Sequence, residues 1–174
     1  LRIMALDRRV FIEQLQAHYQ ASLAQARRAE QDAREAARTM ATESEKREDG
    51  RAAIEFGSLA TGHTGRADTI VGELDALLRF SKVQLPRFDR RTPIAVGAVI
   101  DLATEDDEGA SERTFVMFPV GGGMELTGPG GDGVFSVITP TSPIGKALLG
   151  LKVGDDVDVP SRGGVRSWTV VDVC

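Results

Sequence analysis

The chain has 174 residues, of which 41% are hydrophobic and 27% charged, and its formal net charge is −5; this allows one medium-sized domain or two small ones and excludes a wholly disordered chain. No apolar run reaches the roughly 20 residues of a transmembrane helix, and no basic segment followed by an apolar one indicates a secretory signal. The single cysteine, Cys174, excludes an intrachain disulfide framework and a cysteine-rich zinc site, so a reducing, cytoplasmic location is expected.

The first expected elements are two long helices. From Asp7 to Phe80 the sequence contains no proline and is rich in Ala, Gln, Glu and Arg, which favours helix. A stripe with alternating spacings of three and four residues predicts a coiled-coil seam, because all but one of its members are apolar. The members are Ile12, Leu15, Tyr19, Ser22, Ala26, Ala29, Ala33, Ala36 and Met40. A weaker return stripe contains Phe56, Leu59, Ile70, Leu74 and Leu77 and is interrupted by His63 and Arg66.

The segment between the two stripes, residues 41–51, is the most polar part of this region and contains the turn dipeptide Asp49-Gly50. We therefore predict that residues 1–85 form an antiparallel coiled-coil hairpin with its tip at about 43–51. The alternative is a parallel coiled-coil dimer with a break at this point. Gly57, Gly62 and Gly65 each destabilise the second helix by about 1 kcal/mol relative to alanine, and we expect them to let the two helices approach closely.

After a linker at residues 86–92, residues 93–174 are expected to form a β-rich domain. Strands are predicted at 95–103, 114–120, 134–139 and 167–173, separated by glycine-rich turns. A short helix is predicted at 144–149, because Ser142 can cap it, Pro143 suits its first turn and Gly150 ends it. The predicted fold class is α+β, with a small antiparallel sheet packed on one short helix.

The charge also changes between the two parts. Residues 1–91 contain 16 Lys and Arg against 14 Asp and Glu, whereas residues 92–174 contain 5 against 12, a net charge of −7. Duplex DNA is bound by basic surfaces that neutralise phosphates, so no autonomous binding to DNA is expected. The net charge favours a protein partner with a basic face.

The segment from Ser142 to Pro160, SPIGKALLGLKVGDDVDVP, resembles the signature of the Gre family of bacterial transcript-cleavage factors, in which SPLG is followed by ALLGKKVGDEVEV. Residues 163–173, GGVRSWTVVDV, resemble the final strand of that family, and Gly65-Arg66 matches a position late in its second helix. The resemblance implies an FK506-binding-protein-like C-terminal domain that docks at the rim of the secondary channel of RNA polymerase. The partner-binding residues that it implies are Ser142, Pro143, Ile144 and Gly145.

The resemblance also implies a role for the tip of the hairpin, which would reach the active centre of the polymerase. Acidic residues there would help to hold a Mg²⁺ shared with the polymerase, which then hydrolyses its own backtracked transcript; carboxylates are the hard oxygen ligands that Mg²⁺ prefers. The expected tip acids, both catalytic and metal-binding, are Asp49 and Glu48, and no cofactor of the chain's own is expected.

The tip sequence departs from the family, because residues 41–56 contain no D-x-x-E-N-A-[ED]-Y element. An alignment through Gly65-Arg66 places Lys46 and Asp49 at the two acidic positions. An alignment through Glu55-Phe56 instead places Asp49 and Ala52 there. Either alignment predicts weak or absent stimulation of transcript cleavage.

The predicted protein is therefore a monomeric accessory factor that binds RNA polymerase, regulates elongation or initiation, and is neither an enzyme by itself nor a membrane protein. Two alternatives stay open. One is a peptidyl-prolyl isomerase, although such sites are lined by aromatic residues and residues 93–174 contain only Phe115, Phe118, Phe135 and Trp168. The other is a coiled-coil adaptor, which predicts a parallel dimer without affinity for polymerase.

Overall fold

The described residues of the chain form two compact units. In a computed structural model of the protein, these residues are 7–44, 51–106, 109–161 and 164–174. The helical unit comprises Gln16–Asp75, and the C-terminal unit combines Ala76–Cys174 with the start of the chain up to Leu15. Both long helices therefore contribute residues to both units. The domain boundaries at residues 85 and 93 stay predictions.

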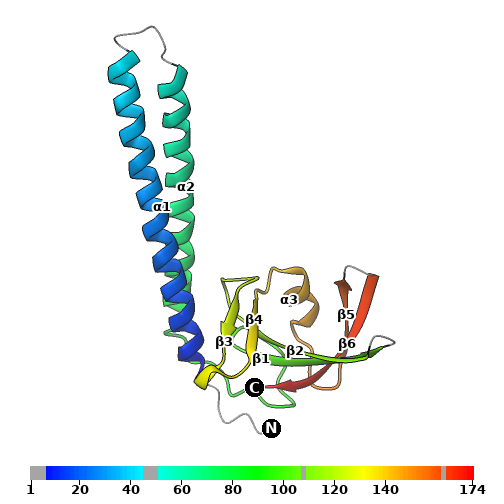
Figure 1. The fold of residues 1–174 in the computed structure, drawn as a ribbon. Coiled ribbons are helices and arrows are strands. Elements are labelled where there is room, and N and C mark those ends of the chain that lie inside the picture. The colour runs from blue at the N-terminus through cyan, green and yellow to red at the C-terminus, as the bar shows by residue number, and fades with distance from the viewer. Residues whose placement is uncertain (1–6, 45–50, 107–108, 162–163) are drawn as a thin grey trace. The chain divides into compact units, whose positions relative to one another are not determined.

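Two helices lie where the proline-free sequence predicts them: α1 spans Arg8–Ser44 and α2 spans Arg51–Phe80. In the helical unit they lie side by side and run in opposite directions (Figure 1). The hydroxyl of Thr64 in α2 donates a hydrogen bond of 2.9 Å to the carboxylate of Glu30 in α1. Most of the predicted tip lies outside the described residues, and supercoiling of the pair stays a prediction. Neither of these two helices, nor any other that is described, is long and apolar enough to cross a membrane.

The buried face of α1 follows the predicted seam, because Tyr19, Ala26 and Ala33 are all buried in the helical unit. The buried face of α2 differs from the prediction. Leu59 is 51% exposed, and the neighbouring Ala60 is buried in its place. From there the buried face continues to Ala67 and Ile70 rather than through Arg66, so the predicted return stripe is wrong in this part of the helix. The helix thus turns small side chains, and not a leucine, towards the alanines of α1.

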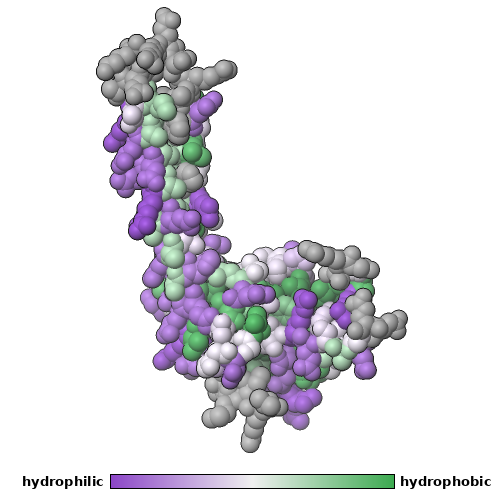
Figure 2. All heavy atoms as spheres, viewed as in Figure 1, coloured by the Kyte–Doolittle hydropathy of each residue, from purple (hydrophilic) through white to green (hydrophobic). Residues whose placement is uncertain are grey.

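The glycines of α2 do not serve close helix packing. A Cβ atom added at Gly57, Gly62 or Gly65 would meet no other atom within 4 Å. The expectation that these glycines let the helices approach closely is therefore wrong, because they border open space instead. Figure 2 shows that hydrophilic side chains cover much of the visible face of the helical unit.

Among the described residues of the C-terminal unit, six strands form one sheet in the order β3-β4-β2-β1-β6-β5. The strands are β1 (Val99–Asp106), β2 (Gly109–Met117), β3 (Glu125–Thr127), β4 (Val134–Ile138), β5 (Asp156–Ser161) and β6 (Gly164–Val173). The helix α3 spans Pro143–Leu148, and a single 3-10 turn, η1, spans Pro129–Gly131. The protein is therefore of the α+β class, as predicted.

The sheet is mixed, so the prediction of an antiparallel sheet is wrong in one pair of strands. β2 and β4 run parallel, with Thr114 aligned to Phe135, whereas the other four pairs are antiparallel. Two strands, β3 and β5, were not predicted. The first predicted strand also begins too early, because residues 95–98 form a turn in which the amide of Ala98 donates to the carbonyl of Ala95. Gly97 has a φ of +98° in this turn, a conformation that favours glycine.

The core of the C-terminal unit lies between α3 and one face of the sheet. Its members include Ile100 and Leu102 of β1, Phe115 of β2, Leu148 of α3 and Trp168 of β6. The other face of the sheet is also partly apolar, because Val99, Val116 and Val137 point to it and are buried. The sheet therefore has buried apolar side chains on both of its faces.

The ends of both long helices pack against this unit. The Phe11 ring of α1 lies 4.7 Å from that of Phe135, and the Phe80 ring of α2 lies 5.4 Å from that of Phe118, measured between centroids. The side-chain amide of Gln14 makes two hydrogen bonds to the main chain of one residue in β3. It donates to the carbonyl of Thr127 at 2.7 Å and accepts from the amide of Thr127 at 2.9 Å.

Candidate functional site

The N-terminal turn of α3 contains the four residues implied as partner-binding, and its conformation follows from local chemistry. Ser142 is the N-cap, and its hydroxyl oxygen accepts a hydrogen bond of 3.1 Å from the amide of Gly145. Pro143 occupies the first helical position, where its missing N–H leaves no bond unmade. This arrangement confirms the predicted cap and the predicted first turn of the helix.

The turn is also fixed to the chain that precedes it. The carbonyl oxygen of Thr139 accepts hydrogen bonds from both the amide of Ser142, at 3.0 Å, and its hydroxyl, at 2.8 Å. A Cβ atom at Gly145 would overlap this carbonyl oxygen and would lie 2.8 Å from the carbonyl carbon of Thr139. Only glycine therefore fits at this position, which gives a physical reason for the glycine of the SPIG segment.

The four residues differ in their exposure to solvent, and therefore in how accessible each is to a partner. Pro143 is exposed, Ser142 and Ile144 are half-buried, and Gly145 is buried. Ile144 packs against the core, so its side chain contributes to folding as well as to any surface. Within this set, Pro143 offers the most accessible side chain for contact with a partner.

The tip acids cannot be placed beside this turn. Asp49 and Glu48, and the aligned Lys46, lie outside the described residues. Among the residues that the structure does describe, no group of three or more His, Cys, Asp or Glu is arranged to hold a metal ion. The structure therefore gives no geometry for the implied Mg²⁺ site.

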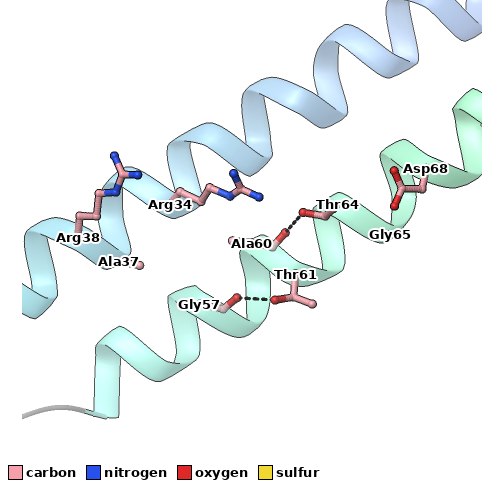
Figure 3. Close-up of a pocket in the computed structure, with 9 residues that line it drawn as sticks. All are labelled: Arg34, Ala37, Arg38, Gly57, Ala60, Thr61, Thr64, Gly65 and Asp68. Atoms are coloured by element: carbon pink, nitrogen blue, oxygen red, sulfur yellow. Dashed lines mark hydrogen bonds between the residues drawn. The ribbon is translucent and has the colours of Figure 1, made fainter.

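A shallow groove of about 610 Å³ lies between α1 and α2 in the helical unit (Figure 3). It is lined by Arg34, Ala37, Arg38, Gly57, Ala60, Thr61, Thr64, Gly65 and Asp68. Arg34 forms an ion pair with Glu30, and Thr64 donates to the same carboxylate. The ion pair lies within α1 and the bond from Thr64 joins the two helices, while the glycines leave the groove open.

The face of the sheet opposite α3 carries acidic residues beside its buried valines. Asp101 of β1 lies there, and its carboxylate accepts a hydrogen bond of 2.6 Å from the hydroxyl of Thr114. Burial raises the pKa of Asp101, and the neighbouring carboxylates of Asp172 and Glu112 raise it further, although the bond from Thr114 acts in the opposite direction. A partner with a basic face stays a prediction from the net charge of the domain.

Sequence analysis missed two arginines on the core side of the sheet. The guanidinium groups of Arg113 and Arg166 both lie near the ring of Trp168. The spacing of Arg166 and Trp168, two residues apart in one strand, is the signal that could have shown that they share a face. No comparable signal links Arg113 to either residue.

With this geometry established, comparison with known proteins identifies the C-terminal unit. Residues 91–174 match the family described as "Transcription elongation factor, GreA/GreB, C-term". The matched region contains α3, its serine cap and all six described strands. Residues 91–174 of the chain are therefore similar to the C-terminal domain of the Gre family.

Its Gre relatives are similar at modest identity. The transcription elongation factor GreA of Syntrophus aciditrophicus is 37% identical over 86 residues, which are 46% of this chain and 53% of that protein. GreA of Zymomonas mobilis is 29% identical over 106 residues, 61% of this chain and 60% of that protein. The matches thus cover little more than half of the length of these relatives.

Two solved structures are similar over a larger share of the chain. Gfh1, a GreA factor homologue of Thermus thermophilus, is 21% identical with a TM-score of 0.35, covering 91% of this chain and 94% of that one. GreA/GreB of Nitrosomonas europaea is 20% identical with a TM-score of 0.34, covering 71% and 90%. The similarity to Gre factors rests on the sequence matches and not on these two structures.

Proposed function

We propose that this protein binds bacterial RNA polymerase through its C-terminal unit and regulates transcription elongation. The observation that carries the proposal is the match of residues 91–174 to the GreA/GreB C-terminal family, within which α3 has a capped and sterically defined first turn. The relatives that match the chain are named transcription elongation factors. The expected monomeric state and cytoplasmic location belong to the same proposal.

In this proposal, the first turn of α3 contacts the polymerase at the rim of its secondary channel. The hydrogen bonds from Ser142 to Thr139, together with the cap on Gly145, hold the turn in one conformation before binding. A surface that is already ordered loses little conformational entropy when a partner binds. Pro143 then supplies an exposed apolar contact at low entropic cost.

The two helices would enter the channel and act mainly by occupying it. In either alignment of the tip, a basic or apolar residue, Lys46 or Ala52, takes one of the two acidic positions. Hydrolysis assisted by a metal ion needs ligands at fixed positions, and a misplacement of about 1 Å can reduce a rate on the order of 10²-fold. We therefore infer weak or absent stimulation of transcript cleavage. A Mg²⁺ shared through Asp49 and Glu48 stays a prediction, and no step of the proposed regulation depends on it.

The docking proposal is tested by measuring the affinity of the full chain for core RNA polymerase. Pro143→Asp adds a negative charge at this exposed position. Aspartate is favourable near the N-terminus of a helix, so α3 should still form. We expect roughly a tenfold loss of affinity, the scale of a central interface residue. Gln84→Asp is the matched control, because it adds the same charge at an exposed position outside α3. Equal affinities for both variants and the wild type would contradict docking through this turn.

The tip is tested with a backtracked elongation complex. The wild type and Asp49→Ala should both give little or no transcript cleavage, and both should compete with an active cleavage factor for the polymerase. Strong cleavage by the wild type that is lost in Asp49→Ala would show instead that the tip supplies a functional carboxylate.

A further inference from the structure

A second groove, of about 460 Å³, lies over β5, β6, β1 and β2 in the C-terminal unit, and we call it the sheet groove. None of the described residues that line it belongs to α3. Three of them are acidic, Glu105, Glu112 and Asp156, and none of them is basic. The other described lining residues are alanines, serines and threonines. The sheet groove therefore combines carboxylates with small side chains.

The strand register explains the shape of the sheet groove. Asp156 of β5 is aligned with Thr169 of β6, which is aligned with Ala103 of β1. Ala103 is aligned in turn with Glu112 of β2. Aligned residues of neighbouring strands point to the same face, so these side chains form one row. The row lies on the face opposite α3, because the preceding Leu102 packs in the core. The two small side chains form the floor of the groove, and a carboxylate stands at each end.

The third carboxylate borders the floor where β1 and β6 separate. The described pairing of these two strands ends at Ala103 and Thr169. Next to this pair, the hydroxyl of Thr104 donates a hydrogen bond of 2.7 Å to the carbonyl of Ser167, so a side chain bridges the strands there. Glu105 lies beyond the paired part of β1. It is two residues from Ala103 and therefore points to the same face as the floor.

The charges of the sheet groove favour a cationic ligand. Its three carboxylates, Glu105, Glu112 and Asp156, are exposed and share one face, so they repel one another. The hydroxyl of Thr169 donates a hydrogen bond of 2.6 Å to the carboxylate of Asp156 and holds it at the end of the floor. Residues 92–174 have a net charge of −7, so the surrounding potential is negative as well. A cationic ligand would relieve the repulsion, whereas the phosphates of a nucleic acid would increase it.

The spacing of the carboxylates favours basic side chains over a metal ion. Neighbouring strands lie about 4.8 Å apart, so the main chains of Glu112 and Asp156 are separated by about 14 Å. A Mg²⁺ or Ca²⁺ ion needs its oxygen ligands within about 2.0–2.6 Å of one centre. In the part of the chain that the structure describes, no three such groups are arranged in this way. Lysine and arginine carry single charges on long flexible stems, so neighbouring basic residues of one segment can each meet a different carboxylate.

We propose that the sheet groove binds a basic segment of a partner protein, with lysine or arginine side chains lying between Glu105, Glu112 and Asp156. The small side chains of the floor leave room for the aliphatic stems, and the carboxylates accept hydrogen bonds from the charged ends. The groove lies on the face opposite α3. This contact is therefore additional to the proposed docking turn and does not rest on binding to RNA polymerase.

The first experiment measures the binding of fluorescein-labelled hexalysine to the full chain by fluorescence anisotropy. We expect saturable binding that weakens as salt is added. Glu112→Gln/Asp156→Asn should weaken it about threefold for each exposed ion pair, roughly tenfold in total. Glu125→Gln/Asp132→Asn is the matched control, because it removes the same charge from two exposed positions of the C-terminal unit outside the groove. This control should stay within about twofold of the wild type. Absence of saturable binding by the wild type, or equal losses in the two variants, would overturn the site.

A further variant separates the groove from its charge. Ala103→Ile fills the floor and leaves all three carboxylates in place, and a β-branched residue suits a strand, so the protein should still fold. We expect a roughly fivefold loss of affinity for hexalysine, the lower end of the cost of overpacking. Far-UV circular dichroism and the midpoint of unfolding check the fold. Unchanged affinity of the folded variant would show that the peptide binds only a diffuse negative surface, and the groove would not be the site.

Nuclear magnetic resonance locates the bound peptide. The amide signals of Ala103, Glu112 and Thr169 should shift as hexalysine is added, whereas those of Glu125 and Asp132 should not. Shifts centred outside the sheet groove would contradict the placement. Mg²⁺ alone, at the same ionic strength, should not displace the peptide. Displacement by Mg²⁺, or tighter binding of a single-stranded oligonucleotide than of hexalysine, would overturn a site for basic side chains.

Discussion

Replacing Gly145 with alanine tests the steric basis of the turn that we propose as the docking surface. The added Cβ would lie 2.8 Å from the carbonyl carbon of Thr139 and 2.9 Å from the hydroxyl oxygen of Ser142. The Cβ would also overlap the carbonyl oxygen of Thr139, and an ordinary contact begins at about 3.4 Å, so either α3 or the residue at 139 must move by more than about one ångström. The carbonyl that must move accepts two hydrogen bonds from Ser142, and the displaced hydroxyl is the cap of the helix.

The expected loss of stability follows from these contacts. Overpacking of this kind costs about 1–3 kcal/mol, and weakening the cap costs about 1 kcal/mol. The higher helix propensity of alanine returns up to about 1 kcal/mol. Gly145→Ala should therefore lower the free energy of unfolding by about 1–3 kcal/mol, which corresponds to a decrease of roughly 2–12 °C in Tm.

The assay is denaturant unfolding followed by the fluorescence of Trp168, which lies in the same unit as α3. Gly65→Ala is the matched control, because a Cβ at that helical position meets no atom within 4 Å. This second variant should raise the stability of the helical unit by roughly 0.5–1 kcal/mol, measured by far-UV circular dichroism. If Gly145→Ala were as stable as the wild type, the close approach to Thr139 could not be the reason for a glycine at this position.

Three further predictions concern single contacts. Ser142→Ala should destabilise the C-terminal unit by about 1 kcal/mol in the same unfolding assay, whereas Ser142→Asp, which can still cap α3, should lose much less; equal losses would contradict the cap. Gln14→Leu keeps the size of the side chain but removes both bonds to Thr127, so hydrogen exchange of the Thr127 amide should accelerate roughly tenfold, and unchanged exchange would show that these bonds contribute nothing. Asp101→Asn concerns pH: because the pKa of Asp101 is raised by burial above its ordinary value of 3.8, the folded state holds this proton more tightly than the unfolded chain. The stability that this group contributes is thus present below pH 3.8 and lost as pH rises through the raised pKa. The free energy of unfolding of Asp101→Asn relative to that of the wild type should therefore increase across that range. A difference that does not depend on pH would refute the assignment.

The elements that could be predicted are those specified by neighbouring residues. The helix predicted at 144–149 is observed at Pro143–Leu148, because its cap, its first-turn proline and its terminating glycine are all local signals. The two long helices follow in the same way from the absence of proline and the frequency of alanine. The segment that resembles the Gre signature contains this locally determined turn, so the sequence alone could predict the conformation of the implied docking residues.

The features that could not be predicted depend on residues far apart in the sequence. The direction of β4 relative to β2 is set by the path of the chain between them, which alternation of side chains does not encode. The three-residue strand β3 is too short to show alternation, and its contact with Gln14 joins residues 113 positions apart. Arg113 reaches Trp168 only through the register of β1, β2 and β6, so no sequence pattern could join them.

The contact between Gln14 and Thr127 has a consequence for how other chains can associate with this sheet. The outermost strand of an open sheet offers unpaired main-chain groups to any extended segment, which can add itself as a further strand. At the edge strand β3, the carboxamide of Gln14 already forms hydrogen bonds with both the N–H and the C=O of Thr127, as an added strand would. The other edge strand, β5, contains Asp156, Asp158 and Pro160. Charged residues and proline both disfavour the addition of a further strand. Both edge strands of the sheet therefore disfavour the addition of another strand and the fibrous aggregation that begins with it, which favours partners that bind a face of the sheet or α3.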